Sequence, residues 1–187
     1  AHYYRISEPD DPTNWGPEQS FKHPHSISYM NLYRHPPDDT LYNFYRDTRG
    51  TYCPAYLISK DHGETWQPGR QLILHGLQGR HRPYPRYWSD GEYIHVSFTE
   101  AHPQEYRDPG CSIYYAKFKG GKFYRADGSP IKDIRKDGAL LPAEAETVCS
   151  GAAQHNAWTS SIVTDTEGRV YFSTNVDPAH GTCNTSG

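Results

Sequence analysis

An octapeptide at residues 59–66, SKDHGETW, constrains the fold more than any other part of the sequence. Its composition is that of a tight turn between two strands. The Asp61 carboxylate can accept hydrogen bonds from backbone N–H groups just ahead of it, and Gly63 can take a positive φ without a steric penalty. Trp66 can fold back as an apolar plug. The octapeptide therefore predicts a hairpin turn with a structural role.

Short hydrophobic runs separated by turn residues surround this octapeptide and predict β-strands. In residues 40–46, Tyr42, Phe44 and Arg46 share one face, while Leu41 and Tyr45 lie on the other. Both faces carry bulky side chains, which a sheet packed between two neighbours requires. Four strands are expected within about fifty residues, the size of one propeller blade, at residues 26–34, 40–46, 52–59 and 71–75.

The same pattern recurs twice along the chain, so we expect an all-β fold with almost no helix. Residues 1–24 are predicted to be an extended lead-in, and residues 132–145 a connecting loop because Gly138 and Pro142 interrupt any helix. Residues 25–187 then form a partial β-propeller domain of about three blades, each of four antiparallel strands, with blades at approximately 25–78, 79–135 and 150–187. Propellers close with four to eight blades. The chain is therefore expected to be part of a larger propeller, or to self-associate if it is complete.

Composition narrows the choice of partner. The formal net charge of −3 gives no reason to expect binding to nucleic acid or to an anionic membrane, and no apolar run approaches the length of a membrane span. Sixteen Tyr, four Trp and six Phe against one Met suit a β-rich protein that binds carbohydrate. The chain starts without Met, as after removal of a leader, although a trimmed chain would look the same. We expect a secreted or periplasmic protein, and Asn184 lies in a glycosylation sequon.

Several segments together resemble a known family. They are Arg82-Pro83-Tyr84, then VSFTEAHP at 96–103, SIYY at 112–115 and GKFYRADG at 121–128. Their order and spacing are similar to those of the BNR-repeat-containing family, which includes ulvan lyases and related polysaccharide lyases. The octapeptide at 59–66 matches the Asp-box of sialidase-like β-propellers. The resemblance extends from about His25 over nearly the whole chain.

The resemblance implies a seven-bladed propeller with a cleft at the inner-strand ends that binds an anionic, uronic-acid-containing polysaccharide. Members of the family often cleave this polymer by β-elimination. Elimination needs a donor that neutralises the uronate carboxylate, a base near C5 and an acid for the leaving oxygen, and Arg, His and Tyr suit these tasks. The expected catalytic residues are His25, Tyr84 and His155, and the expected substrate-binding residues are Arg46, Arg86 and Trp158.

The sequence departs from the ulvan lyases at one position. In those enzymes a pair of His residues lies on one hairpin, and His25 resembles the first of them. Arg46 occupies the second position, where it can still pair with a carboxylate through two hydrogen bonds. This leaves room for another lyase class or for binding without turnover. Structural roles also stay open: two prolines flank Tyr84 as in a rigid scaffold, His25 can be a solvated blade junction, and His35 and His62 are expected to be solvated turn residues.

No cofactor is required by this chemistry, but a structural zinc site is one hypothesis. Two His and two thiolates make a good tetrahedral set, here His102, Cys111, Cys149 and His155. A Cys111–Cys149 disulfide is the main alternative, and buried thiols are a third. A zinc-bound His155 could not also act as a base, so the two roles compete.

Three functions follow from the sequence. The first is a polysaccharide lyase, or a fragment of one, that acts on uronic-acid polymers. The second is a non-catalytic propeller that binds glycans or assembles with copies of itself. The third is a sialidase-like glycoside hydrolase, although its three substrate-binding arginines and its Tyr-Glu pair are not identified in the sequence.

Overall fold

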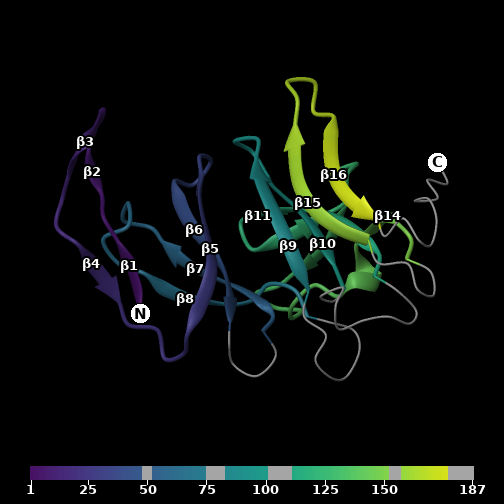
Figure 1. Cartoon of the computed structure of the whole chain (residues 1–187), viewed down its shortest axis with the longest axis horizontal. Coiled ribbons are helices and arrows are strands. Elements are labelled where there is room, and N and C mark those ends of the chain that lie inside the picture. The colour runs from purple at the N-terminus through teal and green to yellow at the C-terminus, as the bar shows by residue number, and fades with distance from the viewer. Residues whose placement is uncertain (48–51, 75–82, 101–110, 152–156, 177–187) are drawn as a thin grey trace.

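The computed structural model describes residues 1–47, 52–74, 83–100, 111–151 and 157–176. These ranges consist of β-strands, turns and one short 3-10 helix, η1 (Pro142–Glu144), which confirms the all-β prediction. Four groups of antiparallel strands stand side by side in chain order, from the purple N-terminal hairpin to the yellow C-terminal hairpin (Figure 1). None of the described segments is a helix long and apolar enough to span a membrane.

The first sheet contains four antiparallel strands in the order β5-β6-β7-β8, as predicted for a blade. They are β5 (Ile27–His35), β6 (Thr40–Asp47), β7 (Pro54–Ser59) and β8 (Gln67–Gln71). The prediction of the fourth strand at residues 71–75 was wrong. The apolar residues after Gln71 instead join a different segment, where Ile73 forms a parallel bridge with Leu140 and the Leu74 N–H donates to the Leu140 carbonyl.

The second sheet has the order β9-β10-β11-β12-β13, and a sixth strand, β14, pairs with β11. These strands are β9 (Tyr84–Ser89), β10 (Ile94–Thr99), β11 (Ile113–Lys119), β12 (Lys122–Tyr124), β13 (Pro130–Asp133) and β14 (Glu146–Cys149). The segment 132–145, expected to be a connecting loop, contains the end of β13 and η1. It leads from β13 to β14, which pairs with β11 of the same sheet.

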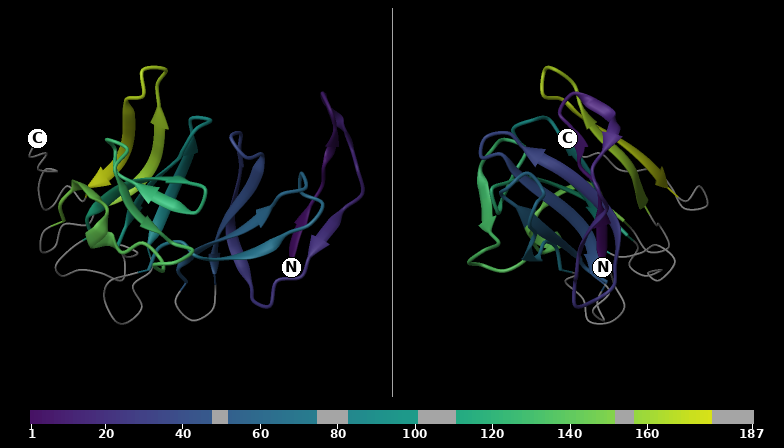
Figure 2. Two further views of the ribbon diagram at one scale, coloured as in Figure 1. Left: turned by 180° about the vertical axis from the view of Figure 1, so that it is seen from behind. Right: turned by 90° about the vertical axis from the view of Figure 1, so that its left-hand side faces the viewer.

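A hairpin lies at each end of the described chain. Residues 1–24, expected to be an extended lead-in, form a long hairpin in which β1 (His2–Tyr4) pairs with β4 (Gln19–Phe21) and β2 (Ser7–Glu8) pairs with β3 (Asp11–Trp15). At the other end, β15 (Ala157–Thr164) pairs with β16 (Val170–Val176). Both ends flank the larger sheets, as the views from behind and from the side also show (Figure 2).

Both faces of β6 are covered, as the sequence predicted. Phe44 is fully buried against the second sheet, where it packs edge-to-face on Phe118. On the opposite face, Tyr45 belongs to a second cluster with Trp66, and Tyr4 and Phe21 of the N-terminal hairpin pack against this cluster. The first sheet is therefore packed between two neighbours, which is the arrangement of successive propeller blades. No closed propeller is formed by the described residues.

The octapeptide forms the β7–β8 turn with the predicted chemistry. The Thr65 N–H donates to Asp61 Oδ1 at 2.9 Å, and the Gly63 N–H donates to Ser59 Oγ at 2.8 Å. Gly63 has φ of +96°, and Trp66 is 6% exposed. The turn is thus a structural element that joins the last two strands of the first sheet.

His35 was expected to be solvated, and this was wrong, because it is 3% exposed. Its Nδ1 lies 2.7 Å from Asp38 Oδ1, and its Nε2 lies 3.1 Å from the carbonyl oxygen of Glu92. The β5–β6 turn is therefore hydrogen-bonded to the β9–β10 turn. The hydrogen bond to Glu92 joins the first two sheets at the end opposite to the predicted cleft.

Candidate functional site

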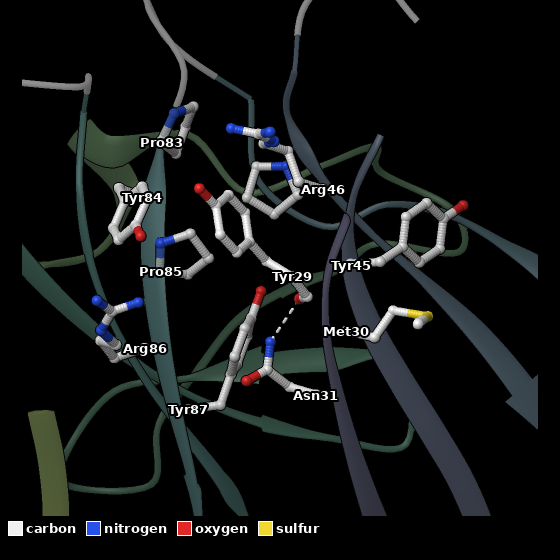
Figure 3. Close-up of a pocket in the computed structure, with 11 residues that line it drawn as sticks. Tyr29, Met30, Asn31, Tyr45, Arg46, Pro83, Tyr84, Pro85, Arg86 and Tyr87 are labelled. Carbon is white, nitrogen blue, oxygen red and sulfur yellow. Dashed lines mark hydrogen bonds between the residues drawn. The ribbon is translucent and has the colours of Figure 1, made fainter. Parts of the chain in front are cut away.

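A cavity of about 220 Å³ lies between the first and second sheets, at the start of β9 and the end of β6. Tyrosines and prolines form most of its wall, with an arginine on either side (Figure 3). The lining residues are Tyr29, Met30, Asn31, Tyr45, Arg46, Pro54, Pro83, Tyr84, Pro85, Arg86 and Tyr87. The side chains of Met30 and Tyr45 point away from the others (Figure 3). The cavity thus lies where the inner-strand ends were expected to form a cleft.

Two tyrosine rings lie close to the Arg46 guanidinium. Its guanidinium carbon is 4.5 Å from the ring centroid of Tyr29 and 5.5 Å from that of Tyr52. Its Nε donates to Ser28 Oγ at 3.0 Å. The stacking and the hydrogen bond fix the guanidinium plane, so that its remaining N–H donors keep a constant direction.

The two tyrosines reach Arg46 through an unusual backbone conformation. Tyr29 and Tyr52 both have φ of 55°, in the left-handed region that residues other than glycine seldom adopt. Tyr29 lies in a bulge, because the register between β5 and β6 shifts between Ser28 and Asn31. The bulge turns the 59% exposed ring of Tyr29 over the arginine. Strained backbone of this kind is common at binding sites.

Arg86 is held in a similar way on the other side of the cavity. Its guanidinium carbon lies 4.7 Å from the ring centroid of Tyr84, and its Nε donates to the Ser160 carbonyl at 3.0 Å. Tyr84 also contacts Trp158 of β15, with ring centroids 4.5 Å apart, and Tyr29 of β5, at 6.0 Å. The rings of Tyr29, Tyr84 and Trp158 therefore form a row across the first strands of three successive sheets.

Neither guanidinium has an anionic partner among the residues that the structure describes. Within the described part of the chain, the contacts of Arg46 and Arg86 are with tyrosine rings, a hydroxyl and a carbonyl oxygen, and neither forms a salt bridge. Both side chains are half-buried. An arginine in such a position attracts an anion strongly, because the charge is shielded from bulk water.

The structure brings together only some of the predicted site residues. Arg46, Tyr84 and Arg86 line the cavity, and Trp158 contacts it through Tyr84. His25 does not line the cavity. Its backbone N–H donates to His23 Nδ1 at 3.3 Å, and its ring lies 6.0 Å from the His23 ring. His155 lies outside the described residues.

The predicted alternative of a Cys111–Cys149 disulfide was wrong. Cys111 is a buried thiol, whereas Cys149 is disulfide-bonded. A disulfide sulfur cannot bind zinc as a thiolate does, and His102 and His155 both lie outside the described residues. Among the residues that are described, no group of three or more His, Cys, Asp or Glu side chains is placed to hold a metal ion. Because two of the four proposed ligands lie outside the described residues, the structure does not test the complete zinc site, which stays a prediction.

Glu100 is an acidic residue near this end of the second sheet that sequence reasoning did not select. It follows Thr99, which pairs with Tyr84 across β9 and β10. Its carboxylate accepts hydrogen bonds from the Ser112 N–H at 2.6 Å and from the Tyr114 hydroxyl at 3.1 Å. Burial raises the pKa of the Glu100 carboxyl despite these bonds. Neither Glu100 nor Tyr114 lines the cavity.

The comparison with family models agrees with this architecture. The model described as "BNR repeat-containing family member" matches residues 1–184. The chain belongs to the BNR repeat-containing family. Membership of the BNR family indicates a sialidase-like or glycan-processing β-propeller. A search of curated proteins and a search of solved structures gave no match, so the finer similarity to ulvan lyases stays a prediction.

Sequence reasoning about this BNR family member missed Tyr29 and Tyr87, which line the cavity. Tyr87 lies on β9 together with Tyr84 and Arg86, but on the opposite face of the strand. The sequence shows all three residues in one strand. Tyr29 gives no signal of this kind, because a simple alternation along β5 does not reveal the bulge that redirects its ring.

Proposed function

We propose that this chain is the substrate-binding part of a polysaccharide lyase that takes a uronic-acid-containing polymer into the cavity between β5, β6 and β9. The observation that carries the proposal is the pair of guanidiniums, Arg46 and Arg86, on either side of a tyrosine-lined cavity. A uronate presents one carboxylate on an otherwise neutral ring. Arginine pairs with carboxylates through two parallel hydrogen bonds, and aromatic rings stack on the apolar faces of sugars.

The row of rings supports a polymer as the ligand. Tyr29, Tyr84 and Trp158 belong to three successive sheets, with neighbouring centroids 6.0 and 4.5 Å apart. A saccharide chain that crosses from sheet to sheet would meet an aromatic side chain at each step. Such a ligand would be held over several residues, as expected for a protein that acts on a polysaccharide in a secreted or periplasmic setting.

In the proposed reaction, a guanidinium pairs with the uronate carboxylate and so acidifies the proton on C5. A base removes this proton. The electron pair of the broken C5–H bond then forms the C4–C5 double bond, and the C4–O bond to the preceding sugar breaks. The leaving oxygen then takes a proton. Tyr84 is the side chain in the cavity wall best suited to proton transfer, since it lies beside Arg86. His155 remains the proposed second group.

Binding without turnover is the second candidate, and a specific observation favours it. His25, one of the proposed bases, does not line the cavity. A site with two arginines and a row of aromatic rings would bind an acidic glycan even if no elimination followed. A glycoside hydrolase is supported less, because the hydrogen-bonded pair of Glu100 and Tyr114 lies away from the cavity lining.

The experiment is to incubate the purified protein with ulvan, with other uronic-acid polymers and with a neutral glucan, and to follow the ultraviolet absorbance of the unsaturated uronate. Binding is measured in parallel by calorimetry. Absorbance that rises with a uronan supports the lyase, and saturable binding to a uronan without such a rise supports the binding protein. If the protein neither binds nor cleaves any uronan, both candidates fail.

A further inference from the structure

The ring of Tyr87 is held rigidly at the wall of the cavity. It stacks on Phe44 with ring centroids 4.7 Å apart and an interplanar angle of 15°, and the Tyr33 ring lies 6.3 Å away. The Tyr33 hydroxyl donates to the Tyr87 carbonyl oxygen at 2.8 Å. In Figure 3 the oxygen end of Tyr87 points toward Tyr29 and Pro85. The direction of the hydroxyl is therefore fixed by the protein.

This hydroxyl is buried and lacks a hydrogen-bond partner among the described residues. Neighbouring polar groups are satisfied, since the Asn31 side-chain amide donates to the Tyr29 carbonyl at 2.7 Å and Arg46 Nε donates to Ser28 Oγ. A buried hydroxyl without a partner destabilises the folded protein, and native proteins seldom keep one without a reason. Among the described residues, folding thus leaves this one polar atom of a cavity-lining side chain without a partner.

The phenol is also held in its neutral form. Burial, and then the nearby Tyr33, raise the pKa of Tyr87 well above its ordinary value. A neutral phenol donates one hydrogen bond. It is a suitable partner for an uncharged oxygen, whereas the guanidiniums of Arg46 and Arg86 suit a carboxylate.

We propose that Tyr87 is a specificity-determining residue whose hydroxyl donates a hydrogen bond to a ring hydroxyl of the saccharide that fills the cavity. This inference rests on the proposed function in that the ligand is a saccharide. The arginines recognise the charge of the ligand, and Tyr87 recognises the position of one of its neutral oxygens. Sugars that differ only at that hydroxyl would be distinguished, since the wrong epimer leaves the phenol unpaired.

The test compares Tyr87→Phe with Tyr33→Phe, which removes the same atom from a hydroxyl that has a partner. Thermal unfolding is measured without ligand, and dissociation constants are measured for uronate and neutral oligosaccharides. Tyr87→Phe is expected to unfold at the wild-type temperature or higher and to bind saccharide about three- to tenfold more weakly. Tyr33→Phe is expected to unfold at a lower temperature and to bind like the wild type. The proposal is overturned if Tyr87→Phe lowers the unfolding temperature as Tyr33→Phe does, or if it binds every saccharide like the wild type.

Measurements with both uronate and neutral oligosaccharides also separate the role of Tyr87 from the proposed function. If the wild type binds neutral oligosaccharides but no uronate, and Tyr87→Phe weakens that binding, the uronate function fails and the role of Tyr87 stands. If the wild type binds uronates and Tyr87→Phe binds them equally well, the function stands and the role of Tyr87 is overturned. If no saccharide binds to the wild type, both are overturned.

Discussion

The hydroxyls of Ser97 and Thr159 lie 2.6 Å apart across the boundary between the second sheet and the C-terminal hairpin, and both residues are 0% exposed. The boundary between the first and second sheets, by contrast, is centred on packed aromatic rings such as Phe44 and Phe118. Arg86 and Trp88 also cross the boundary to the C-terminal hairpin with hydrogen bonds, to the Ser160 carbonyl and the Thr164 hydroxyl. The β15–β16 hairpin is therefore positioned by directional bonds, and it carries Trp158 to the candidate site.

A double-mutant cycle tests this boundary. Thr159→Val leaves the Ser97 hydroxyl buried and unpaired, which should lower the free energy of unfolding by about 1–3 kcal/mol. Ser97→Ala should leave the Thr159 hydroxyl unpaired and lower the free energy of unfolding by a similar amount. The double variant should lose less than the sum of the two single variants, because no unpaired hydroxyl remains. Denaturant unfolding measures all four proteins, and additive losses would show that the two hydroxyls do not interact.

Gly69 of β8 lies against the ring of Tyr56, and this predicts a steric effect. A Cβ at residue 69 would lie 2.7 Å from the backbone oxygen of Tyr56 and would also meet its 2% exposed ring. Gly69→Ala should therefore lower the free energy of unfolding by about 1–3 kcal/mol. Gln67→Ala, at an exposed position of the same strand, should change it by less than about 0.5 kcal/mol. Equal stability of both variants would contradict the predicted clash.

Asp61 predicts how the turn at 59–66 responds to acid. Hydrogen bonds from the Thr65 side chain, the Thr65 N–H and the Ser59 hydroxyl lower the pKa of Asp61 from 3.8 to about 2. A lowered folded-state pKa contributes stability that is fully present above the unfolded value of 3.8 and is lost as the pH falls through about 2. Asp61→Asn should thus unfold at a lower temperature than the wild type at pH 7.

The difference between wild type and Asp61→Asn should shrink between about pH 4 and pH 2. Melting temperatures across this range check the expectation. The non-titrating variant Gln67→Ala serves as the control, since its difference from the wild type should stay constant. A difference for Asp61→Asn that does not change with pH would mean that the carboxylate charge is not what holds the turn.

Arginine substitutions test the electrostatics of the site. Arg46→Gln and Arg86→Gln should each weaken binding of a uronan about 10- to 100-fold, because each removes a charged hydrogen-bond donor. Arg46→Lys should be intermediate, since lysine keeps the charge but loses the stacking on Tyr29 and the second parallel hydrogen bond. Arg34→Gln, at an exposed position outside the cavity, should bind like the wild type. Equal loss from the three Gln substitutions, with none from Arg46→Lys, would point to overall charge rather than to the cavity.

The sequence predicted those parts of the fold that depend on local patterns. Alternation along residues 40–46 predicted both covered faces of β6, and the spacing of Asp61, Gly63 and Trp66 predicted the β7–β8 turn. The fourth strand was misplaced because β8 has no apolar periodicity and is held by backbone pairing with β7. The apolar run after it is buried by the segment around Leu140, a contact too distant in the sequence for pattern reasoning to find.

The sequence likewise predicted only part of the candidate site. Arg46, Tyr84 and Arg86 were found because charged and aromatic residues at strand ends gather at one edge of neighbouring sheets. Tyr29 was missed because a bulge decides where its ring points. His25 was placed in the site, but its backbone N–H and its ring contact His23 instead. Strand order is readable from a sequence, whereas side-chain direction at a bulge depends on tertiary packing.

The bridge between Ile73 and Leu140 has a consequence for how the chain acquires its structure. Ile73 and Leu140 are both 0% exposed, and the two backbone hydrogen bonds beside them join the end of the first sheet to the segment between β13 and β14 of the second. During synthesis, the end of the first sheet cannot complete this pairing until residue 140 has left the ribosome. Contacts between distant residues form slowly. The first sheet should therefore gain its full resistance to proteolysis only when the second is complete, so that the two sheets mature as one cooperative unit.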